Sequence, residues 1–392
     1  MAVAIAALTA EHHHDGFGLA VASPRLSWRF NDSDAKHWYQ SSYDIEIHRG
    51  DASESYHVNS PESVLVPWPS KPLRSREQVR VKTRSTGRDG LQTEWAELLI
   101  EAALLERDEW KAALISGPKQ SNETSKKPFR LRKTFSVSKK PAFARLYATA
   151  HGVYEIEING ERAGDYVLAP GFTSYKHRLN YQMYDVTNLL HEGDNVIGVY
   201  VAEGWFAGRL GRPSVSNIWG DRLGFLAQLE CDGEAACITD ASWEWLDGPI
   251  QAASIYDGEE YDSSQEQSDW SKPGSQAVGK GPVEELPFPS ATLIAPEAPP
   301  GRRVMELKPV ELITTPSGKK VLDFGQNLVG WLRIEKQIDG QPGQAVLIRH
   351  AEVMEHGELG VRPLRTAKAQ NIVKLGGNVK GYQPRFTFFG FR

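Results

Sequence analysis

The sequence contains little cysteine, no excess of positive charge and no long apolar run. Only 2 of its 392 residues are cysteine, which excludes a disulfide-dense scaffold and provides too few thiols for a zinc site. Lysine and arginine number 45 against 50 acidic residues, so a net charge of -5 offers no basic face to nucleic acid. No segment approaches the roughly 20 apolar residues that cross a bilayer, so we expect no membrane partner.

The apolar residues do not follow the period of long helices and instead favour β-strands. Tyr43–His48 and Val79–Arg84 alternate apolar and polar residues, which is typical of antiparallel strands with one wet face. Tyr154–Gly160 alternates in the same way and ends in Asn159-Gly160, a pair that favours a type I′ hairpin turn. The sequence therefore predicts an all-β fold.

Turn-rich segments divide the chain into three predicted domains. A polar stretch at Ser116–Pro128 follows the first domain, and a proline-rich stretch at Pro287–Pro300 precedes the last. Hydrophobic cores usually divide at about 100 to 200 residues, so this length suits several domains. We expect three consecutive antiparallel β-sandwiches, at residues 1–105, 106–290 and 300–392, with strands in the last at Val321–Phe324, Gly330–Ile334 and Ala345–Arg349.

The chain stops within an apolar stretch. Pro384–Arg392 predicts a β-strand, and no turn or polar tail follows it. We therefore expect the third sandwich to be incomplete at its C-terminal end. Such an end leaves an unpaired edge and exposed aromatic rings, which is an aggregation hazard, at Phe386, Phe388, Phe389 and Phe391.

A glycine-rich stretch in the second domain is the candidate carbohydrate-binding site. Residues 204–224 contain too much glycine for one continuous strand, so we expect loops at one end of the sandwich. Sugars pack their C–H faces on aromatic rings and pair their hydroxyls with carboxylates and arginine. As an alternative, the two tryptophans fill the sandwich core, and the sequence leaves both open. The candidate residues are Glu203, Trp205, Phe206, Arg209, Trp219, Asp221 and Arg222.

Three carboxylates near the end of the second domain are candidate calcium ligands. Asp257, Glu259 and Asp262 offer hard oxygen atoms at a spacing that a calcium loop can use, although the pattern is far from a complete calcium-loop signature. No other cofactor is expected. Paired carboxyl groups can also serve as a general acid and base, but with 50 acidic residues such clusters arise freely, so we single out no catalytic residue.

Three motifs of the second domain stand out: Val167–Tyr175, Tyr184–Thr187 and Glu203–Arg209. Together they resemble the N-terminal sandwich of α-L-rhamnosidases of glycoside hydrolase family 78. The resemblance extends over nearly the whole chain and implies a fibronectin III-like or immunoglobulin-like first domain, a carbohydrate-binding-like jelly roll and a concanavalin-like third domain. The further motifs that carry it are Ser23–Trp28, Ile255–Glu259, Asp323–Gly330 and His350–Glu352.

The resemblance also implies what the chain contributes to an enzyme. In that family a downstream (α/α)₆ barrel supplies the general acid and base that hydrolyse terminal α-L-rhamnosides with inversion, and no such segment is present in this sequence. We therefore expect accessory domains that bind L-rhamnose or rhamnosides and dock on the absent catalytic barrel, without hydrolase activity of their own. Some members of the family carry a calcium-dependent, rhamnose-binding module in the same sandwich, which is why calcium remains an expectation.

Two other functions and two locations stay open. The chain is alternatively a free-standing carbohydrate-binding protein, or a diverged sandwich with a new activity on the second-domain loops. The apolar opening Ala2–Ala10 lacks the basic start of a signal peptide, so we expect a first strand and a cytoplasmic protein, with an extracellular one as the alternative. Cys231 and Cys237 could face each other across a hairpin, but we expect reduced thiols.

Overall fold

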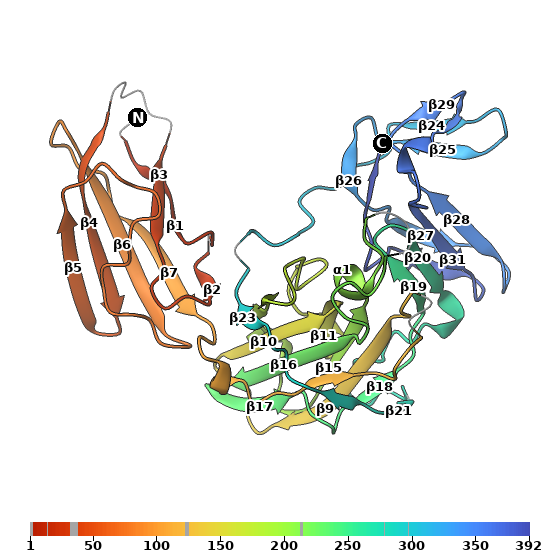
Figure 1. The fold of residues 1–392 in the computed structure, drawn as a ribbon, viewed down its shortest axis with the longest axis horizontal. Coiled ribbons are helices and arrows are strands. Elements are labelled where there is room, and N and C mark those ends of the chain that lie inside the picture. The colour runs from red at the N-terminus through yellow and green to blue at the C-terminus, as the bar shows by residue number, and fades with distance from the viewer. Residues whose placement is uncertain are drawn as a thin grey trace. The chain divides into compact units, whose positions relative to one another are not determined.

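The computed structural model describes residues 3–13, 15–31, 38–121, 125–211, 215–277, 279–296 and 298–392. Regular structure in these ranges is nearly all β-strand, which confirms the predicted all-β class (Figure 1). The one α-helix among the described residues is α1 (Gly204–Ala207), and no described helix is long and apolar enough to cross a membrane. The chain forms two compact units, of which the first is Met1–Lys111 with Tyr181–Tyr184 and Leu293–Pro299.

The first unit is a sandwich with strand orders β1-β3 in one sheet and β2-β7-β6-β4-β5 in the other. Its core lies between the two sheets, because alternate residues of the predicted strands, such as Ile45 and Val81, point inward and meet Trp28. One pairing departs from the antiparallel prediction, since β2 runs parallel to β7. The strands are β1 (Ile5–Ala10), β2 (Phe17–Leu19), β3 (Leu26–Phe30), β4 (Gln40–Arg49), β5 (Ala52–Val58), β6 (Gln78–Gly87) and β7 (Ala96–Ala102).

The second unit begins with a sandwich of two antiparallel sheets. Their strand orders are β10-β16-β8-β22, with β17 also paired to β16, and β12-β11-β15-β9-β18-β21. The strands are β8 (Leu114–Ser116), β9 (Phe129–Val137), β10 (Ala144–His151), β11 (Val153–Ile158), β12 (Glu161–Arg162), β15 (Gly193–Ala202), β16 (Gly224–Cys231), β17 (Glu234–Ile238), β18 (Glu244–Leu246), β21 (Gly281–Pro282) and β22 (Glu284–Leu286). Further short strands of the chain are β13 (Arg178–Asn180), β14 (Gln182–Asp185) and β23 (Thr292–Ile294).

The hairpin between β11 and β12 has the predicted type I′ turn. Ile158 pairs with Glu161, and the two residues between them have φ angles of 55° at Asn159 and 85° at Gly160. Positive φ at both central positions is the mark of this turn. The Asn159 side chain also accepts the backbone N–H of Val196 at 2.9 Å, so the turn residue fastens the hairpin to β15.

The predicted second and third domains share one sheet. It has the order β19-β20-β31-β28, in which β20 runs parallel to β31, so the proline-rich stretch does not separate two sets of strands. Its strands are β19 (Ile250–Ser254), β20 (Gly258–Asp262), β28 (Ala345–Arg349) and β31 (Gln370–Lys374). Four two-stranded pairs complete this part: β24 (Glu311–Thr314) with β25 (Lys320–Asp323), β26 (Leu328–Gly330) with β33 (Phe389–Phe391), β27 (Ile334–Ile338) with β32 (Val379–Tyr382), and β29 (Met354–Glu355) with β30 (Glu358–Leu359).

One strand predicted for this region is wrong. Gly330–Ile334 is not a single strand, because β26 ends at Gly330 and β27 begins at Ile334. The two strands pair with different partners, β33 and β32. A local alternation of apolar and polar residues cannot reveal that the chain changes partner between them.

The exposed phenylalanines predicted near the C-terminus are also a wrong prediction. Phe386 is 1% exposed and packs in a core cluster with Tyr200 and Trp270. Phe389 and Phe391 are buried beside His350, and Phe388 is half-buried. Only Phe389–Phe391 of the predicted final strand is regular, and it pairs with β26. Packing against residues distant in the sequence covers these rings.

Both cysteines are free thiols, as predicted. They lie on neighbouring strands but do not face each other, because Cys231 pairs with Glu234 and Cys237 pairs with Leu229 across β16 and β17. Burial raises the pKa of the Cys237 thiol to about 12. Because neither cysteine lies opposite the other across the two strands, they are not arranged for a disulfide within this hairpin.

Candidate functional site

The candidate site lies at one end of the sandwich that opens the second unit. His151 at the end of β10 pairs with Gly224 at the start of β16, and Val153 at the start of β11 pairs with Ala202 at the end of β15. The turn at Gly152 and the connection from β15 to β16 therefore leave the two sheets at the same end, as predicted. That connection, residues 203–223, contains α1, and its residues 212–214 lie outside the described ranges.

An aromatic cluster occupies this end and centres on Phe172. Its ring centroid lies 6.1 Å from that of Tyr175, 6.3 Å from Trp205 and 6.4 Å from Trp219. Phe172 is 57% exposed, whereas both tryptophans are half-buried. The indole Nε1 of Trp219 has no hydrogen-bond partner within the described residues. The Trp219 Nε1 is itself buried, so the cluster presents an apolar surface of the kind on which sugar rings pack.

Some of the candidate aromatic residues pack in the core, as the alternative interpretation of this loop predicted. Trp205 packs against a buried cluster that includes Ala202, Ile250 and Phe386, so it belongs to the core on one side and to the loop surface on the other. Phe206 is buried and stacks on His151, with ring centroids 4.5 Å apart. Phe206 is therefore a core residue, and the expectation that it contributes to a binding face is wrong.

Glu203 stabilises the start of the loop through a buried hydrogen bond. Its side chain is 2% exposed, and its Oε2 accepts the backbone N–H of Lys126 at 2.8 Å. Burial raises the pKa of the Glu203 carboxyl to about 7, against the opposing effect of its hydrogen bonds. Because this carboxyl faces protein on all sides, it fixes the segment before β9 against α1 and does not reach the surface.

The two candidate arginines are held by carboxylates of this unit. Arg209 donates to Asp257 at 2.8 Å and to the backbone oxygen of Thr366 at 3.1 Å. Arg222 donates to both carboxylate oxygens of Glu284, at 3.2 and 2.7 Å. Both therefore anchor loops, and the pair Arg209–Asp257 lies between the candidate loop and the last part of the chain. Asp221, the remaining candidate, is half-buried in the same loop.

The three candidate calcium ligands do not converge on one site. Asp257 pairs with Arg209, Asp262 pairs with Lys374 at 3.2 Å, and Glu259 is buried, where it accepts the Tyr382 hydroxyl at 3.0 Å. No cluster of three or more potential metal ligands occurs within the ranges that the structure describes. The structure thus engages each of these carboxylates in a separate protein contact, and calcium binding stays a prediction.

Sequence reasoning missed Phe172 and Tyr175. Both lie in the motif Val167–Tyr175, which carries the family resemblance but has no Gly-Trp-Arg composition to indicate a binding surface. Their place beside Trp205 and Trp219 depends on a loop from a different part of the chain. Only the fold reveals that Phe172 is exposed beside the buried Tyr175 and the half-buried tryptophans.

Three family models match successive parts of the chain. They are a Rha78A-like N-terminal immunoglobulin domain at residues 5–106, the α-L-rhamnosidase N-terminal domain at residues 139–305 and a bacterial α-L-rhamnosidase concanavalin-like domain at residues 313–392. The chain belongs to the α-L-rhamnosidase family. The matched domains follow the order that the sequence motifs predicted, and this assignment favours the rhamnosidase interpretation over a free-standing binding protein or a diverged sandwich.

Known α-L-rhamnosidases match this chain over nearly the whole length of the chain. The enzyme of Alteromonas sp. strain LOR is 33% identical over 96% of this chain and 43% of its own length. The structure of the native Aspergillus terreus enzyme matches with 45% identity and a TM-score of 0.92, over 100% of this chain and 46% of that one. A Streptomyces avermitilis enzyme solved in complex with L-rhamnose matches with 25% identity and a TM-score of 0.89, over 100% and 55%. The chain thus spans about half the length of these relatives.

Proposed function

We propose that this chain is the carbohydrate-binding accessory portion of an α-L-rhamnosidase, and that the loop end of its second sandwich binds terminal L-rhamnose. The observation that carries the proposal is the exposed Phe172 ring, set among Tyr175, Trp205 and Trp219. Contiguous apolar surface marks interaction and ligand sites, and Phe172 continues into the two half-buried tryptophans. The complete enzyme would hydrolyse terminal α-L-rhamnose from glycosides.

The chemistry of the cluster suits a deoxyhexose. L-Rhamnose carries a methyl group at C6 and C–H groups on its ring, which pack on aromatic faces, and hydroxyls that need polar partners. Phe172 and the half-buried tryptophans supply the apolar surface. The complex of the Streptomyces avermitilis relative with L-rhamnose supports the choice of this sugar.

Hydrolysis is not assigned to this chain. Glu203 has a raised pKa and lies close enough to Asp257 to feel its charge, which is the pattern of an acid and base pair. Glu203 is nevertheless buried and bonded to the Lys126 backbone, and Asp257 is paired with Arg209. Neither carboxyl is available to a glycosidic oxygen or to an attacking water, so binding is the better supported function.

The test compares two exposed phenylalanines of one sandwich. Phe172→Ala removes the centre of the aromatic cluster, whereas Phe143→Ala removes a ring that is 45% exposed and precedes β10. Phe143 lies at the opposite end of β10 from His151, about 26 Å away at the usual rise per residue. Calorimetric titration with L-rhamnose is expected to show at least about tenfold weaker binding for Phe172→Ala, which is the order of one aromatic contact. Equal binding by both variants would overturn the assignment of this site.

A further inference from the structure

The aromatic cluster around Phe172 continues to a residue near the C-terminus. The ring centroid of Trp205 lies 6.3 Å from that of Phe172 and 6.5 Å from that of Phe388. Trp219 lies 6.4 Å from Phe172, so the contacts connect four rings in the order Trp219, Phe172, Trp205 and Phe388. Such separations are typical of aromatic side chains in contact. We call these four residues the aromatic strip.

Each ring of the aromatic strip keeps surface that is open to solvent. Phe172 is 57% exposed, and Trp205, Trp219 and Phe388 are half-buried. A single exposed ring is ordinary on a protein surface, whereas several in contact form the continuous apolar surface that ligand sites use. The strip is therefore a larger binding surface than Phe172 and the two tryptophans alone.

Packing and one hydrogen bond fix the position of Phe388. Trp205 and Phe388 both pack on the buried cluster that includes Phe386. Thr387 is 1% exposed, and its hydroxyl donates to the backbone oxygen of Ser254 at 3.0 Å. The Phe388 ring is therefore preorganised, so a ligand that stacks on it loses little free energy to ordering this side chain.

The aromatic strip is too long for one monosaccharide. Phe172 and Phe388 are connected through Trp205 by two centroid separations, of 6.3 and 6.5 Å. A pyranose ring is about as wide as one phenyl ring, so L-rhamnose on Phe172 leaves the Phe388 ring uncovered. The group that the glycosidic bond attaches to rhamnose is the part of a rhamnoside that can cover Phe388.

We infer that the aromatic strip binds a rhamnoside in two subsites, with L-rhamnose at Phe172 and the second ring of the glycoside at Trp205 and Phe388. This inference rests on the proposed function and extends it from the free sugar to the glycoside. The second ring is the aglycone of an aryl rhamnoside or another sugar, since both present an apolar face that stacks on an aromatic ring. The glycosidic bond holds the second ring at a high effective concentration, so its contact adds affinity.

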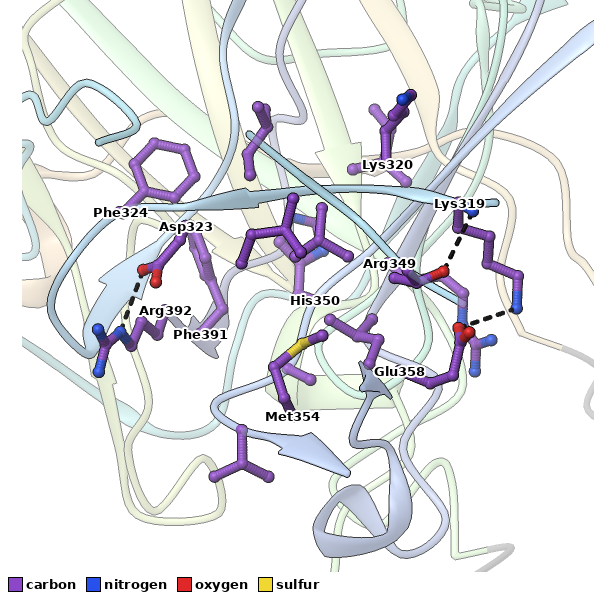
Figure 2. Close-up of a pocket in the computed structure, with 18 of the residues that line it drawn as sticks. Lys319, Lys320, Asp323, Phe324, Arg349, His350, Met354, Glu358, Phe391 and Arg392 are labelled. Carbon is purple, nitrogen blue, oxygen red and sulfur yellow. Dashed lines mark hydrogen bonds and ion pairs between the residues drawn. The ribbon is translucent and has the colours of Figure 1, made fainter. Parts of the chain in front are cut away.

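A separate apolar hollow is the rival position for the second ring. Its volume is about 1320 Å³, and Figure 2 shows Phe324, Phe391 and Met354 around it. Leu347 of β28 also lines this hollow and is 57% exposed. Phe388 is not one of the lining residues. Substitutions at Leu347 and at Phe388 therefore distinguish the two positions.

The test measures the affinities of three rhamnosides for the 392-residue chain by calorimetric titration. Methyl α-L-rhamnopyranoside has no second ring, phenyl α-L-rhamnopyranoside has an aryl ring, and a rhamnosyl-glucose disaccharide has a second sugar. The phenyl glycoside, the disaccharide or both should bind about three- to tenfold more tightly than the methyl glycoside, which is the contribution of one stacked ring. Equal affinities for all three would overturn the inference.

Phe388→Leu tests the second subsite, because leucine keeps apolar packing on the buried cluster but removes the ring. It should abolish the gain from the second ring and leave the methyl glycoside unaffected, whereas Phe172→Ala should weaken all three. Leu347→Ala is the control and should leave every affinity unchanged. A gain that survives Phe388→Leu, or that Leu347→Ala removes, would overturn the inference alone. Failure of the methyl glycoside to bind would overturn the proposed function as well, which separates the two outcomes.

Discussion

The backbone N–H of Arg385 donates to Glu259 Oε2 at 2.9 Å, joining residues 126 positions apart in the chain. The other oxygen of this buried carboxyl accepts the Tyr382 hydroxyl at 3.0 Å. Arg385 itself pairs with Glu155 of β11 at 2.9 Å. These contacts connect the last segment of the chain with β20 and with the sandwich that carries the proposed sugar site. They explain why the two regions, distinct in sequence, form one compact unit.

Glu259→Ala should destabilise the second unit. The substitution leaves the Tyr382 hydroxyl and the Arg385 N–H buried without an acceptor, at a cost of about 1 to 3 kcal/mol each. Glu260→Ala is the control, because Glu260 is the adjacent glutamate of β20 and is exposed. Urea unfolding of both variants measures the difference. A loss of stability no larger for Glu259→Ala than for Glu260→Ala would contradict the role of this carboxyl.

Two buried carboxyls should make the unit less stable as pH rises toward neutrality. Burial raises the pKa of Glu203 and of Glu259 to about 7, from an ordinary value of 4.5. The folded state therefore holds these protons more tightly than the unfolded state does. Their stabilising effect is fully present below about pH 4.5 and is lost as pH rises through about 7.

Glutamine variants test this pH dependence. Glu203→Gln and Glu259→Gln remove one titrating carboxyl each, so the fall in the free energy of unfolding between about pH 5 and 7.5 should become smaller in either variant. The expected change is on the order of 3 kcal/mol or less per group, from a pKa difference of about two and a half. Denaturant unfolding at several pH values measures it. An unaltered slope in both variants would show that burial does not control these groups.

Alanine at Gly258 should cost more than alanine at Gly233. Both glycines have positive φ, 97° and 86°, so alanine is strained at either position by about 1 to 2 kcal/mol. A Cβ at Gly258 would lie 1.7 Å from the Gln370 carbonyl oxygen, whereas a Cβ at Gly233 would meet nothing within 4 Å. Gly258→Ala therefore also breaks the start of the β20–β31 pairing. Thermal unfolding compares the two, and equal losses would argue against that pairing.

Thiol labelling should distinguish the two cysteines. Cys237 is buried, with a pKa raised to about 12, so its reactive thiolate is scarce in the folded protein, whereas Cys231 is half-buried. A chromogenic disulfide reagent is expected to modify Cys231 first and Cys237 only after unfolding. Unfolding without reductant should release two thiols in total. Fewer than two would reveal a disulfide, and rapid reaction of both in the native state would contradict the burial of Cys237.

The sequence predicted local features well because they depend on neighbouring residues. Alternation located β4 and β6, and Asn159-Gly160 specified its own turn, since both rest on the backbone preferences of a few residues. Features that depend on residues distant in the sequence were not predicted. The burial of Phe386 requires Tyr200 and Trp270, and the parallel pairing of β20 with β31 crosses the proline-rich stretch.

The candidate site shows the same division. Composition indicated Trp205 and Trp219, and the structure brings both to one loop end beside Phe172. Composition also indicated Glu203 and Arg209, but both are hydrogen-bonded within the protein. Glu203 accepts the backbone N–H of Lys126, and Arg209 donates to Asp257 and to the backbone oxygen of Thr366. A charged residue in a glycine-rich loop serves equally to hold the loop or to bind a ligand. Only its partners decide between these roles, and the sequence does not display them.

The decisive measurement for rhamnose binding is calorimetric titration of the 392-residue chain with L-rhamnose, once with calcium and once with a chelator. L-Fucose serves as the comparison sugar, because it is also a deoxyhexose but places its hydroxyls differently. We expect saturable binding of L-rhamnose at one site, lost in Phe172→Ala, and a difference between the two buffers would reveal whether calcium takes part. Absence of heat with L-rhamnose in both buffers would contradict a sugar-binding role for this chain.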